Sequence, residues 1–232
     1  MAFNRGPKII TQGLVLALDA ASKNSYPGSG TVWTDLSGNS NTGSLVNGPT
    51  FSSDNNGSIV FDSTDDKVSL PAGSNFAYGT GDFSVEGWFY QTGIHSSYGD
   101  RIFTQTVSGT NYFVIQGGTD VASNSQPQIH FAFSTGGITS PILYSLNQWN
   151  YLCISRISNV ISIYLNGTFT VSGACTFNFT NTTYVPTIGA FTHSNSNNFH
   201  GRIAIIRVYK GVGLTSTQVS QNYNATKSRF NL

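Results

Sequence analysis

Three aspartates gather within one short turn of this chain, Asp62, Asp65 and Asp66 in the segment DSTDD. Carboxylate oxygens are the hard ligands that Ca²⁺ prefers, and turn-rich loops supply further backbone carbonyls. The segment lies between two short apolar runs, so the same aspartates can instead accept hydrogen bonds from the backbone of a tight turn. The sequence therefore predicts either a calcium site or an Asx-type turn here. Calcium is the one cofactor that it suggests.

A second set of residues has the chemistry for sugar binding. Such sites combine an aromatic face with amides and carboxylates that hydrogen-bond to hydroxyl groups. Sandwich proteins also bury aromatic residues, so each ring can alternatively belong to the core. Trp88 and Trp149 are expected in the core or on a sheet face. The candidate glycan-binding aromatics lie in segments expected to form loops: Tyr26, Trp33, Tyr78, Tyr98 and Tyr184.

Hydrolytic chemistry is not supported by the residues present. Glycosidases use two carboxyl groups about 5–9.5 Å apart, but Glu86 is the only glutamate and no second acid shares its apolar run. Asp82 precedes that run in a Gly-Asp turn, where an aspartate usually caps the backbone locally. The four histidines are scattered, and no G-x-S-x-G motif marks a nucleophile. We expect no enzymatic activity.

Composition limits the partners. Charged residues make up 9% of the 232 residues and the net charge is +1, so no basic field is available to hold nucleic acid. No segment approaches the roughly 20 apolar residues that span a bilayer, and we expect no membrane insertion. Gly13 and Asp19 interrupt the apolar run at the N-terminus, which argues against a signal peptide. Synthesis in a cytoplasm is expected. Cys153 and Cys175 are then expected to be buried free thiols, with a disulfide as the alternative.

Short apolar runs separated by clusters of Gly, Asn, Ser and Asp predict an all-β antiparallel sandwich. Phe83–Tyr90 is the central strand, because aromatics on both alternating faces indicate that both faces are covered. Phe199–Tyr209 is a second long strand. The sequence predicts one arm over residues 1–12 and one domain over residues 13–232. The other expected strands are Leu14–Leu18, Ser44–Val46, Ser58–Phe61, Lys67–Leu70, Ile102–Gln105, Tyr112–Gln116, Gln128–Phe133, Trp149–Arg156 and Val160–Leu165.

One short helix is predicted near the C-terminus. Thr215 and Gln218 form a T-x-x-Q capping box, and Leu214 can pack onto Val219 as a hydrophobic staple. The helix is expected to plug one end of the sheets. Two tight turns are also predicted, at Ser158-Asn159 and at Asn166-Gly167.

The order of these segments carries a family resemblance. GLVLALDA, IVFDSTDDKVSL, FSVEGWFY, WNYLCISRISNVISIYLNG and FHGRIAIIRVYKGVGLTSTQVSQNYNA together resemble the concanavalin A-like lectin/glucanase (laminin-G-like) jelly roll. They also resemble the version of it found in structural proteins of tailed bacteriophages. The resemblance extends from about Gly13 to Asn224 and implies two curved antiparallel sheets packed face to face. Because this fold hosts lectins, adhesion domains and glucanases, it does not by itself choose a function.

Two functions are therefore expected. The leading hypothesis is a non-enzymatic virion surface protein of a bacteriophage (a decoration, fibre or adhesion component), made in the host cytoplasm and displayed on the particle. Its partners would be other virion proteins, further copies of itself and a cell-surface glycan. The alternative is a soluble carbohydrate-binding lectin module that is not part of a virion.

Overall fold

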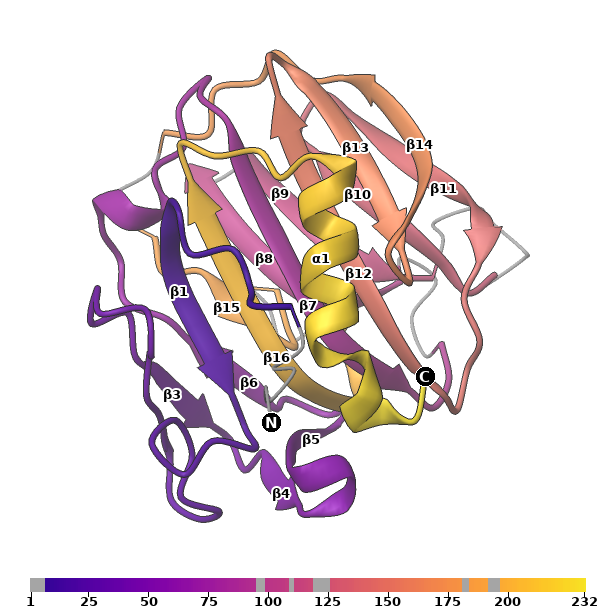
Figure 1. The fold of residues 1–232 in the computed structure, drawn as a ribbon. Coiled ribbons are helices and arrows are strands. Elements are labelled where there is room, and N and C mark those ends of the chain that lie inside the picture. Colours follow the sequence, from indigo (N-terminus) through magenta and orange to yellow (C-terminus); the bar gives the residue numbers. More distant parts are fainter. Residues whose placement is uncertain (1–6, 95–98, 109–110, 119–125, 181–183, 192–196) are drawn as a thin grey trace, which may run out of the picture.

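Two antiparallel β-sheets pack face to face, and one α-helix lies on the outer face of one of them (Figure 1). The computed structural model describes residues 7–94, 99–108, 111–118, 126–180, 184–191 and 197–232. Within these residues, no helix has the length and apolar character needed to cross a membrane. The predicted all-β sandwich with one C-terminal helix is confirmed.

The first sheet, called sheet A, has the strand order β14-β13-β12-β7-β16-β5-β4, and β1 also pairs with β16. β7 therefore lies between β12 and β16, in the middle of the sheet. Its strands are β1 (Leu14–Asp19), β4 (Thr50–Ser52), β5 (Ser58–Asp62), β7 (Phe83–Gln91), β12 (Trp149–Ile157), β13 (Val160–Leu165), β14 (Thr168–Ala174) and β16 (His200–Lys210).

The second sheet, sheet B, has the order β11-β10-β9-β8-β15-β6-β3-β2. Its strands are β2 (Val32–Trp33), β3 (Gly43–Val46), β6 (Lys67–Ser69), β8 (Asp100–Ser108), β9 (Asn111–Gly117), β10 (Gln128–Phe133), β11 (Gly136–Leu143) and β15 (Thr187–Ile188). Strands β2, β4, β11, β14 and β15 were not among the predicted elements. The helices are α1 (Ser216–Thr226) and three 3₁₀ turns: η1 (Asp54–Asn56), η2 (Ser74–Phe76) and η3 (Lys227–Phe230).

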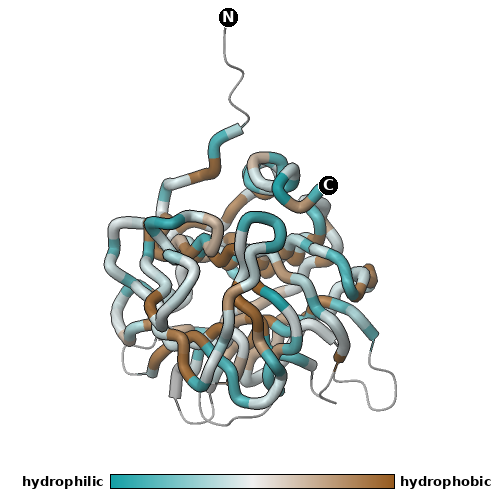
Figure 2. Tube along the Cα trace, turned by 90° about the horizontal axis from the view of Figure 1, so that it is seen from below, coloured by the Kyte–Doolittle hydropathy of each residue, from teal (hydrophilic) through white to brown (hydrophobic). Residues whose placement is uncertain are grey.

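Strand β7 is buried on both faces, as its sequence predicts. Phe83, Val85 and Phe89 belong to the core between the sheets, whereas Trp88 belongs to a second apolar cluster on the outer face of sheet A. Since side chains alternate along a strand, Glu86 shares this outer face with Trp88. In Figure 2 the apolar segments run along the strands inside the molecule, and most polar segments lie at its periphery.

Helix α1 begins as the sequence predicts but lies in a different place. The Thr215 hydroxyl accepts a hydrogen bond from the backbone N–H of Gln218, and the Gln218 side chain accepts one from the backbone N–H of Thr215. The prediction that the helix plugs one end of the sheets is wrong. It lies over β16, β7 and β12 on the outer face of sheet A (Figure 1), where Tyr223 stacks on Trp88 with ring centroids 5.6 Å apart. The outer face of β7 carries the Trp88 ring, and the helix covers it.

Both predicted turns are confirmed. Ser158 and Asn159 join β12 to β13, and Asn166 and Gly167 join β13 to β14, each pair with positive φ. Asparagine and glycine tolerate this left-handed conformation, which suits the twist of a hairpin. Cys153 and Cys175 are buried free thiols, the first of the two alternatives that the sequence leaves open.

Candidate functional site

Three of the five predicted glycan-binding aromatics lie in the core. Tyr26 and Trp33 are 2% and 0% exposed, and Tyr78 is 5% exposed. Tyr78 stacks on Phe83 with ring centroids 4.6 Å apart, and the hydroxyl of Tyr26 donates to the Gly30 carbonyl at 2.7 Å. The prediction is therefore corrected for these three rings. Trp33 belongs to strand β2, and the segments of Tyr26 and Tyr78 turn their rings into the core. Burying such large rings stabilises the core more than exposing them would.

For the other two candidates, Tyr98 and Tyr184, a role in glycan binding stays a prediction. Tyr98 lies outside the described residues. Tyr184 is half-buried in the segment that leads to β15.

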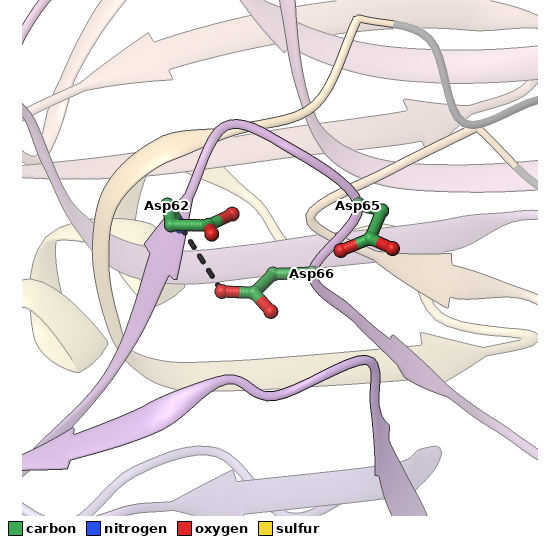
Figure 3. A group of neighbouring side chains, drawn as sticks. All are labelled: Asp62, Asp65 and Asp66. Carbon is green, nitrogen blue, oxygen red and sulfur yellow. Dashed lines mark hydrogen bonds between the residues drawn. The ribbon is translucent and has the colours of Figure 1, made fainter.

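The three aspartates come together as the sequence suggests (Figure 3). One carboxylate oxygen from each of Asp62, Asp65 and Asp66 lies within 4.8 Å of those of the other two. The turn also uses two of them: Asp62 accepts a hydrogen bond from the Thr64 backbone N–H at 2.8 Å, and Asp66 accepts one from the Asp62 backbone N–H at 3.1 Å. The Asx-type turn is thus present, and it leaves other carboxylate oxygens that could bind a metal.

The set of donors fits a hard cation. Carboxylates are the ligands of Ca²⁺, which also takes backbone carbonyls and water. Burial raises the pKa of Asp66 to about 6, and the carboxylates of Asp62 and Asp65 add to the increase, although the backbone hydrogen bond from Asp62 opposes it. A cation here would have to displace a proton below about pH 6, so its affinity would rise with pH.

The raised pKa of Asp66 gives a testable pH dependence. An unfolded aspartate has a pKa near 3.9, so the folded state holds the proton of Asp66 more tightly. This favours folding at low pH, and the benefit is lost as the pH rises from about 4 to about 6. Asp66→Asn keeps a hydrogen-bond acceptor and removes the titration. As the pH rises from about 4 to about 6, the free energy of unfolding of Asp66→Asn should therefore increase by about 1–3 kcal/mol relative to that of the wild type. This range follows from about 1.4 kcal/mol per unit of pKa difference.

Urea denaturation of both proteins at several pH values measures this difference. Identical pH profiles for the wild type and Asp66→Asn would contradict the predicted contribution of Asp66.

A pocket of about 610 Å³ lies at one end of sheet A. This volume is within the range of about 300–1,000 Å³ typical of small-molecule sites. The pocket combines aromatic rings, exposed amides and one acidic and one basic side chain. It is lined by Asp54, Asn55, Tyr90, Asn147, Gln148, Trp149, Arg202, Phe230, Asn231 and Leu232.

The aromatic side of the pocket is a continuous cluster of three rings. Tyr90 meets Trp149 edge to face with centroids 5.7 Å apart, and Trp149 lies 4.7 Å from the ring of Phe230. Tyr90 is half-buried, whereas Trp149 and Phe230 are 8% and 4% exposed. The indole N–H of Trp149 donates to the side-chain oxygen of Asn55 at 2.9 Å. The ring of Trp149 is thereby held in place.

The charged side of the pocket is an exposed ion pair. Arg202 Nη1 lies 2.6 Å from Asp54 Oδ2, and the guanidinium carbon of Arg202 lies 5.2 Å from the ring centroid of Tyr90. Arg202 and Tyr90 are direct partners in the register of β16 and β7. The strand pairing therefore places the guanidinium against the tyrosine ring.

Arg229 connects two walls of the pocket. Its guanidinium donates to the backbone carbonyl of Asn55 at 2.7 Å and to that of Gly57, and it forms an ion pair with Asp19 at 2.6 Å. The side-chain amide of Asn55 in turn donates to the carbonyl of Arg229 at 3.2 Å. Turns η1 and η3 are thus fixed to each other, although 174 positions separate Asn55 from Arg229.

Sequence reasoning missed this pocket. The available signal was weak: Trp149 follows two amides, Asn147 and Gln148, and Tyr90 ends the central strand. Trp149 was expected in the core or on a sheet face, and it is both nearly buried and part of the pocket wall. Its partners come from distant parts of the chain, so no local pattern shows them together.

The solved structures with similar folds include several binding domains. Domain 4 of AbnA, an extracellular arabinanase from Geobacillus stearothermophilus in complex with arabinotriose, has a TM-score of 0.71 at 16% identity, over 90% of this chain and 98% of that one. The binding domain of Paraclostridial Mosquitocidal Protein 1 has a TM-score of 0.68 at 15% identity, over 92% of this chain and 52% of that one.

A third structure comes from a study of botulinum neurotoxin type C whose cell entry depends on interaction with two ganglioside molecules. Its TM-score is 0.67 at 15% identity, over 94% of this chain and 52% of that one. The chain thus spans about half the length of the toxin chains that it matches. At these identities the likeness shows the fold.

A search of curated protein sequences gave no match. The family model of the concanavalin A-like lectin/glucanases superfamily matches residues 62–220, well over half of the chain. This match agrees with the two-sheet sandwich and with the resemblance carried by the sequence segments. The chain belongs to the concanavalin A-like lectin/glucanases superfamily.

Proposed function

We propose that this chain is a non-catalytic carbohydrate-binding domain and that the pocket beside Tyr90, Trp149 and Arg202 is its glycan site. The observation that carries the proposal is the composition of the pocket: a cluster of aromatic rings, exposed amides and an exposed ion pair in a space of about 610 Å³. A sugar ring has an apolar C–H surface and a rim of hydroxyl groups. Aromatic rings suit the first and polar side chains suit the second.

The exposed amides favour a polyhydroxylated ligand. Asn147, Gln148 and Asn231 are exposed, and each amide offers both donors and acceptors. A hydroxyl group also donates and accepts, so one amide can bind two neighbouring hydroxyls. The polar groups around the rings therefore suit a sugar better than a purely apolar ligand.

The similar structures support the proposal as fold neighbours. The match to the arabinanase domain covers 98% of that domain's chain, and its structure was solved in complex with arabinotriose. Botulinum neurotoxin type C interacts with two ganglioside molecules, but the chain matches only 52% of that protein. Arabinotriose is therefore the first probe to try.

The surroundings of Glu86 and Asp82, the two acidic residues considered as possible catalytic groups, agree with a non-catalytic role. Glu86 is 0% exposed and lies among protein donors on the outer face of sheet A. Asp82 accepts a hydrogen bond from the backbone N–H of Ser158 at 2.9 Å and so supports the β12–β13 hairpin. Glycoside hydrolysis requires two carboxyl groups that flank a bound substrate, and these two residues do not offer that arrangement.

Isothermal titration calorimetry tests the proposed site. Arabinotriose and a panel of short oligosaccharides are titrated into the wild type, Tyr90→Ala and the control variant Phe169→Ala. Phe169 is also a large ring, 51% exposed, and does not line the pocket. Tyr90→Ala should weaken binding of the best ligand at least tenfold, about 1.4 kcal/mol, because the ligand loses its ring contact.

Phe169→Ala should bind as the wild type does. Equal affinity of the wild type and Tyr90→Ala for that ligand would place the glycan site elsewhere.

We propose, as a more specific role, that the chain is displayed on the surface of a bacteriophage particle. It rests on the sequence segments that resemble phage structural proteins, and neither the family model nor the three structures described above names a phage protein. On this proposal the chain is made in the host cytoplasm and exposed on the virion surface with other virion proteins. Mass spectrometry of purified particles would detect it, and particles without the chain would rule this location out.

A further inference from the structure

Resting on the proposed carbohydrate function, we propose that the pocket selects neutral glycans over anionic ones, and that Asp54 and Arg202 together bind two adjacent hydroxyl groups of the sugar. The inference concerns the class of glycan and the two side chains that choose it. It follows from the hydrogen-bonding groups that this ion pair leaves free, from the balance of charge in the pocket, and from the way both side chains are held.

The ion pair has groups left for a ligand. Arg202 Nη1 donates to Asp54 Oδ2 at 2.6 Å, and among the described residues this is the only hydrogen bond of either charged group. A guanidinium carries five N–H donors and a carboxylate has two acceptor oxygens. Asp54 Oδ1 and the remaining N–H groups of Arg202 therefore stay available. The side chains of Arg202 and Asp54 are 30% and 63% exposed, so a ligand can reach them.

A pair of neighbouring hydroxyl groups matches this arrangement. One hydroxyl donates to the free carboxylate oxygen of Asp54, and the next accepts from an N–H of Arg202. Each bond involves a charged group and is stronger than a hydrogen bond between neutral groups. A diol can use both members of the pair at once without separating them.

An anionic sugar fits less well. Among the side chains that line the pocket, Asp54 is the acidic one and Arg202 is the basic one, so the side-chain charges of the lining balance. A carboxylate or sulfate that approaches Arg202 also approaches Asp54, which lies within 2.6 Å of the guanidinium. Repulsion from Asp54 then opposes the attraction to Arg202. Arg229 precedes the pocket residue Phe230 in the chain. Its guanidinium is already bound to Asp19 and to backbone carbonyls, so it does not attract an anionic sugar in place of Arg202.

Both side chains are held before a ligand arrives. The Tyr90 ring lies beneath the Arg202 guanidinium, at 5.2 Å from its carbon atom. Asp54 belongs to η1, whose next residue, Asn55, is bound by Trp149 and by Arg229. A site fixed in this way loses little conformational freedom on binding.

The test is a printed array of neutral oligosaccharides together with their carboxylated and sulfated counterparts. Galactotriose with trigalacturonate and lactose with 3′-sialyllactose are two such pairs. The full chain is compared with Asp54→Asn, Arg202→Gln and Tyr90→Ala, and with Asp65→Asn as the control. Asp65→Asn removes the same charge as Asp54→Asn, but Asp65 does not line the pocket. Thermal unfolding of each variant confirms that it is folded.

The wild type should retain neutral members and not their anionic counterparts. Asp54→Asn and Arg202→Gln should each weaken that retention about tenfold, the effect of one charge-assisted hydrogen bond. Asp54→Asn should in addition gain affinity for anionic counterparts, because it leaves Arg202 unopposed. Asp65→Asn should behave as the wild type.

Three outcomes would overturn the inference. If anionic glycans are retained as strongly as neutral ones and Tyr90→Ala abolishes that retention, the pocket is a glycan site but the selection is wrong. If neutral retention is unchanged in both Asp54→Asn and Arg202→Gln, these side chains do not bind the hydroxyls. If the wild type retains no glycan, the proposed function fails together with this inference.

Discussion

Glu86→Gln is expected to lower the free energy of unfolding by about 3–5 kcal/mol, the loss typical when one partner of a buried ion pair is removed. Glu86 and Arg207 lie on neighbouring strands of sheet A, with Oε1 and Nη1 3.0 Å apart and side chains 0% and 6% exposed. Burial alone would lower the pKa of Arg207, but the charge and hydrogen bond of Glu86, together with Tyr209 and Tyr151, hold the pKa above its usual value. The variant would thus leave a buried guanidinium charge without its partner.

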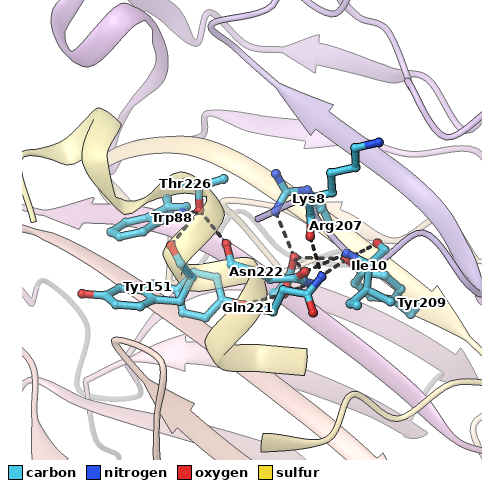
Figure 4. A network of polar contacts seen from close by, with 11 residues as sticks. Lys8, Ile10, Trp88, Tyr151, Arg207, Tyr209, Gln221, Asn222 and Thr226 are labelled. Carbon is cyan, nitrogen blue, oxygen red and sulfur yellow. Dashed lines mark hydrogen bonds and ion pairs between the residues drawn. The ribbon is translucent and has the colours of Figure 1, made fainter. Parts of the chain in front are cut away.

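The hydrogen bonds around Glu86 increase the expected loss. Its carboxylate accepts hydrogen bonds from the hydroxyls of Tyr151 at 2.5 Å and Tyr209 at 3.2 Å. The side-chain amide nitrogen of Asn222 lies 3.1 and 3.0 Å from its two oxygens and donates to both. Figure 4 shows Arg207, Tyr209 and the α1 residue Asn222 converging on one place. Every partner donates. A glutamine amide would turn one of its own N–H donors toward these donors, and buried polar groups would lose their bonds.

The same network holds the N-terminal segment in place. The backbone N–H of Ile10 donates to the Asn222 side chain at 2.8 Å, and Gln221 donates to the carbonyl of Lys8 at 2.6 Å (Figure 4). The sequence predicted an N-terminal arm over residues 1–12. Its described part contacts helix α1 of its own chain. Glu86→Gln should therefore also increase amide hydrogen exchange in residues 8–10.

Urea denaturation measures the change in stability, and Asp54→Asn is the matched control. It also neutralises one acidic partner of an arginine, but this pair is exposed, and such pairs contribute about 0–1 kcal/mol. A similar small effect for Glu86→Gln and Asp54→Asn would show that the buried network does not stabilise the fold.

Arg156→Met is expected to cost about 3 kcal/mol or more. Arg156 is 0% exposed, and its guanidinium donates to the carbonyls of Gly79, Gly81 and Phe177, at 2.8 Å from Nη2, 2.9 Å from Nε and 2.8 Å from Nη1. Methionine fills much of the same space but has no N–H donors. The Gly79 carbonyl would keep its hydrogen bond from the Phe179 backbone N–H at 2.9 Å. The carbonyls of Gly81 and Phe177 would lose their Arg156 donor, at about 1–3 kcal/mol each where water does not replace the bond.

The rings around Arg156 add to this effect. Its guanidinium carbon lies 5.0 Å from the ring centroids of both Phe83 and Phe179. Burial lowers the pKa of Arg156, and the charge is compensated by the carbonyl dipoles and the ring faces around it. Arg156 therefore joins the segment around Gly79 to the segment around Phe179, which pair through a single β-bridge.

Urea denaturation of Arg156→Met, Arg156→Lys and the exposed-site control Arg202→Gln separates charge from geometry. Lysine keeps the charge but not the planar fork, so Arg156→Lys should recover only part of the loss. Arg202→Gln should change stability by less than about 1 kcal/mol. A full recovery by lysine would mean that charge alone matters, and a small loss for Arg156→Met would show that the carbonyls find other partners.

The fold could be predicted because its main signals are local. The alternation along Phe83–Tyr90, the Thr215–Gln218 capping box and the Asn166-Gly167 turn each depend on residues within a few positions of one another. The position of helix α1 depends on more distant residues, since its packing partner Trp88 lies 138 positions from Thr226, to which it donates a hydrogen bond. The apolar side of the helix was visible in the sequence, but the surface that covers it was not.

The candidate site could be predicted only in part. The three aspartates are close in sequence, so their proximity in space follows from the turn. In the pocket, Asp54 and Arg202 are 148 positions apart and their contact requires β16, η1 and η3 to be in place. Loop composition suggested that Tyr26, Trp33 and Tyr78 are exposed, but polar neighbours do not prevent a ring from turning into the core. Burial of single rings in irregular segments depends on tertiary packing, which local composition does not encode.

The central claim is that this chain binds carbohydrate through the pocket, and a glycan-array screen of the full chain in calcium and in chelator tests it most directly. The account predicts selective retention of some glycans that is equal in both conditions and lost in Tyr90→Ala, because Asp62, Asp65 and Asp66 do not line the pocket. Retention that disappears with chelator but persists in Tyr90→Ala would place the site at the aspartates. The absence of retention in both conditions would contradict a carbohydrate-binding function.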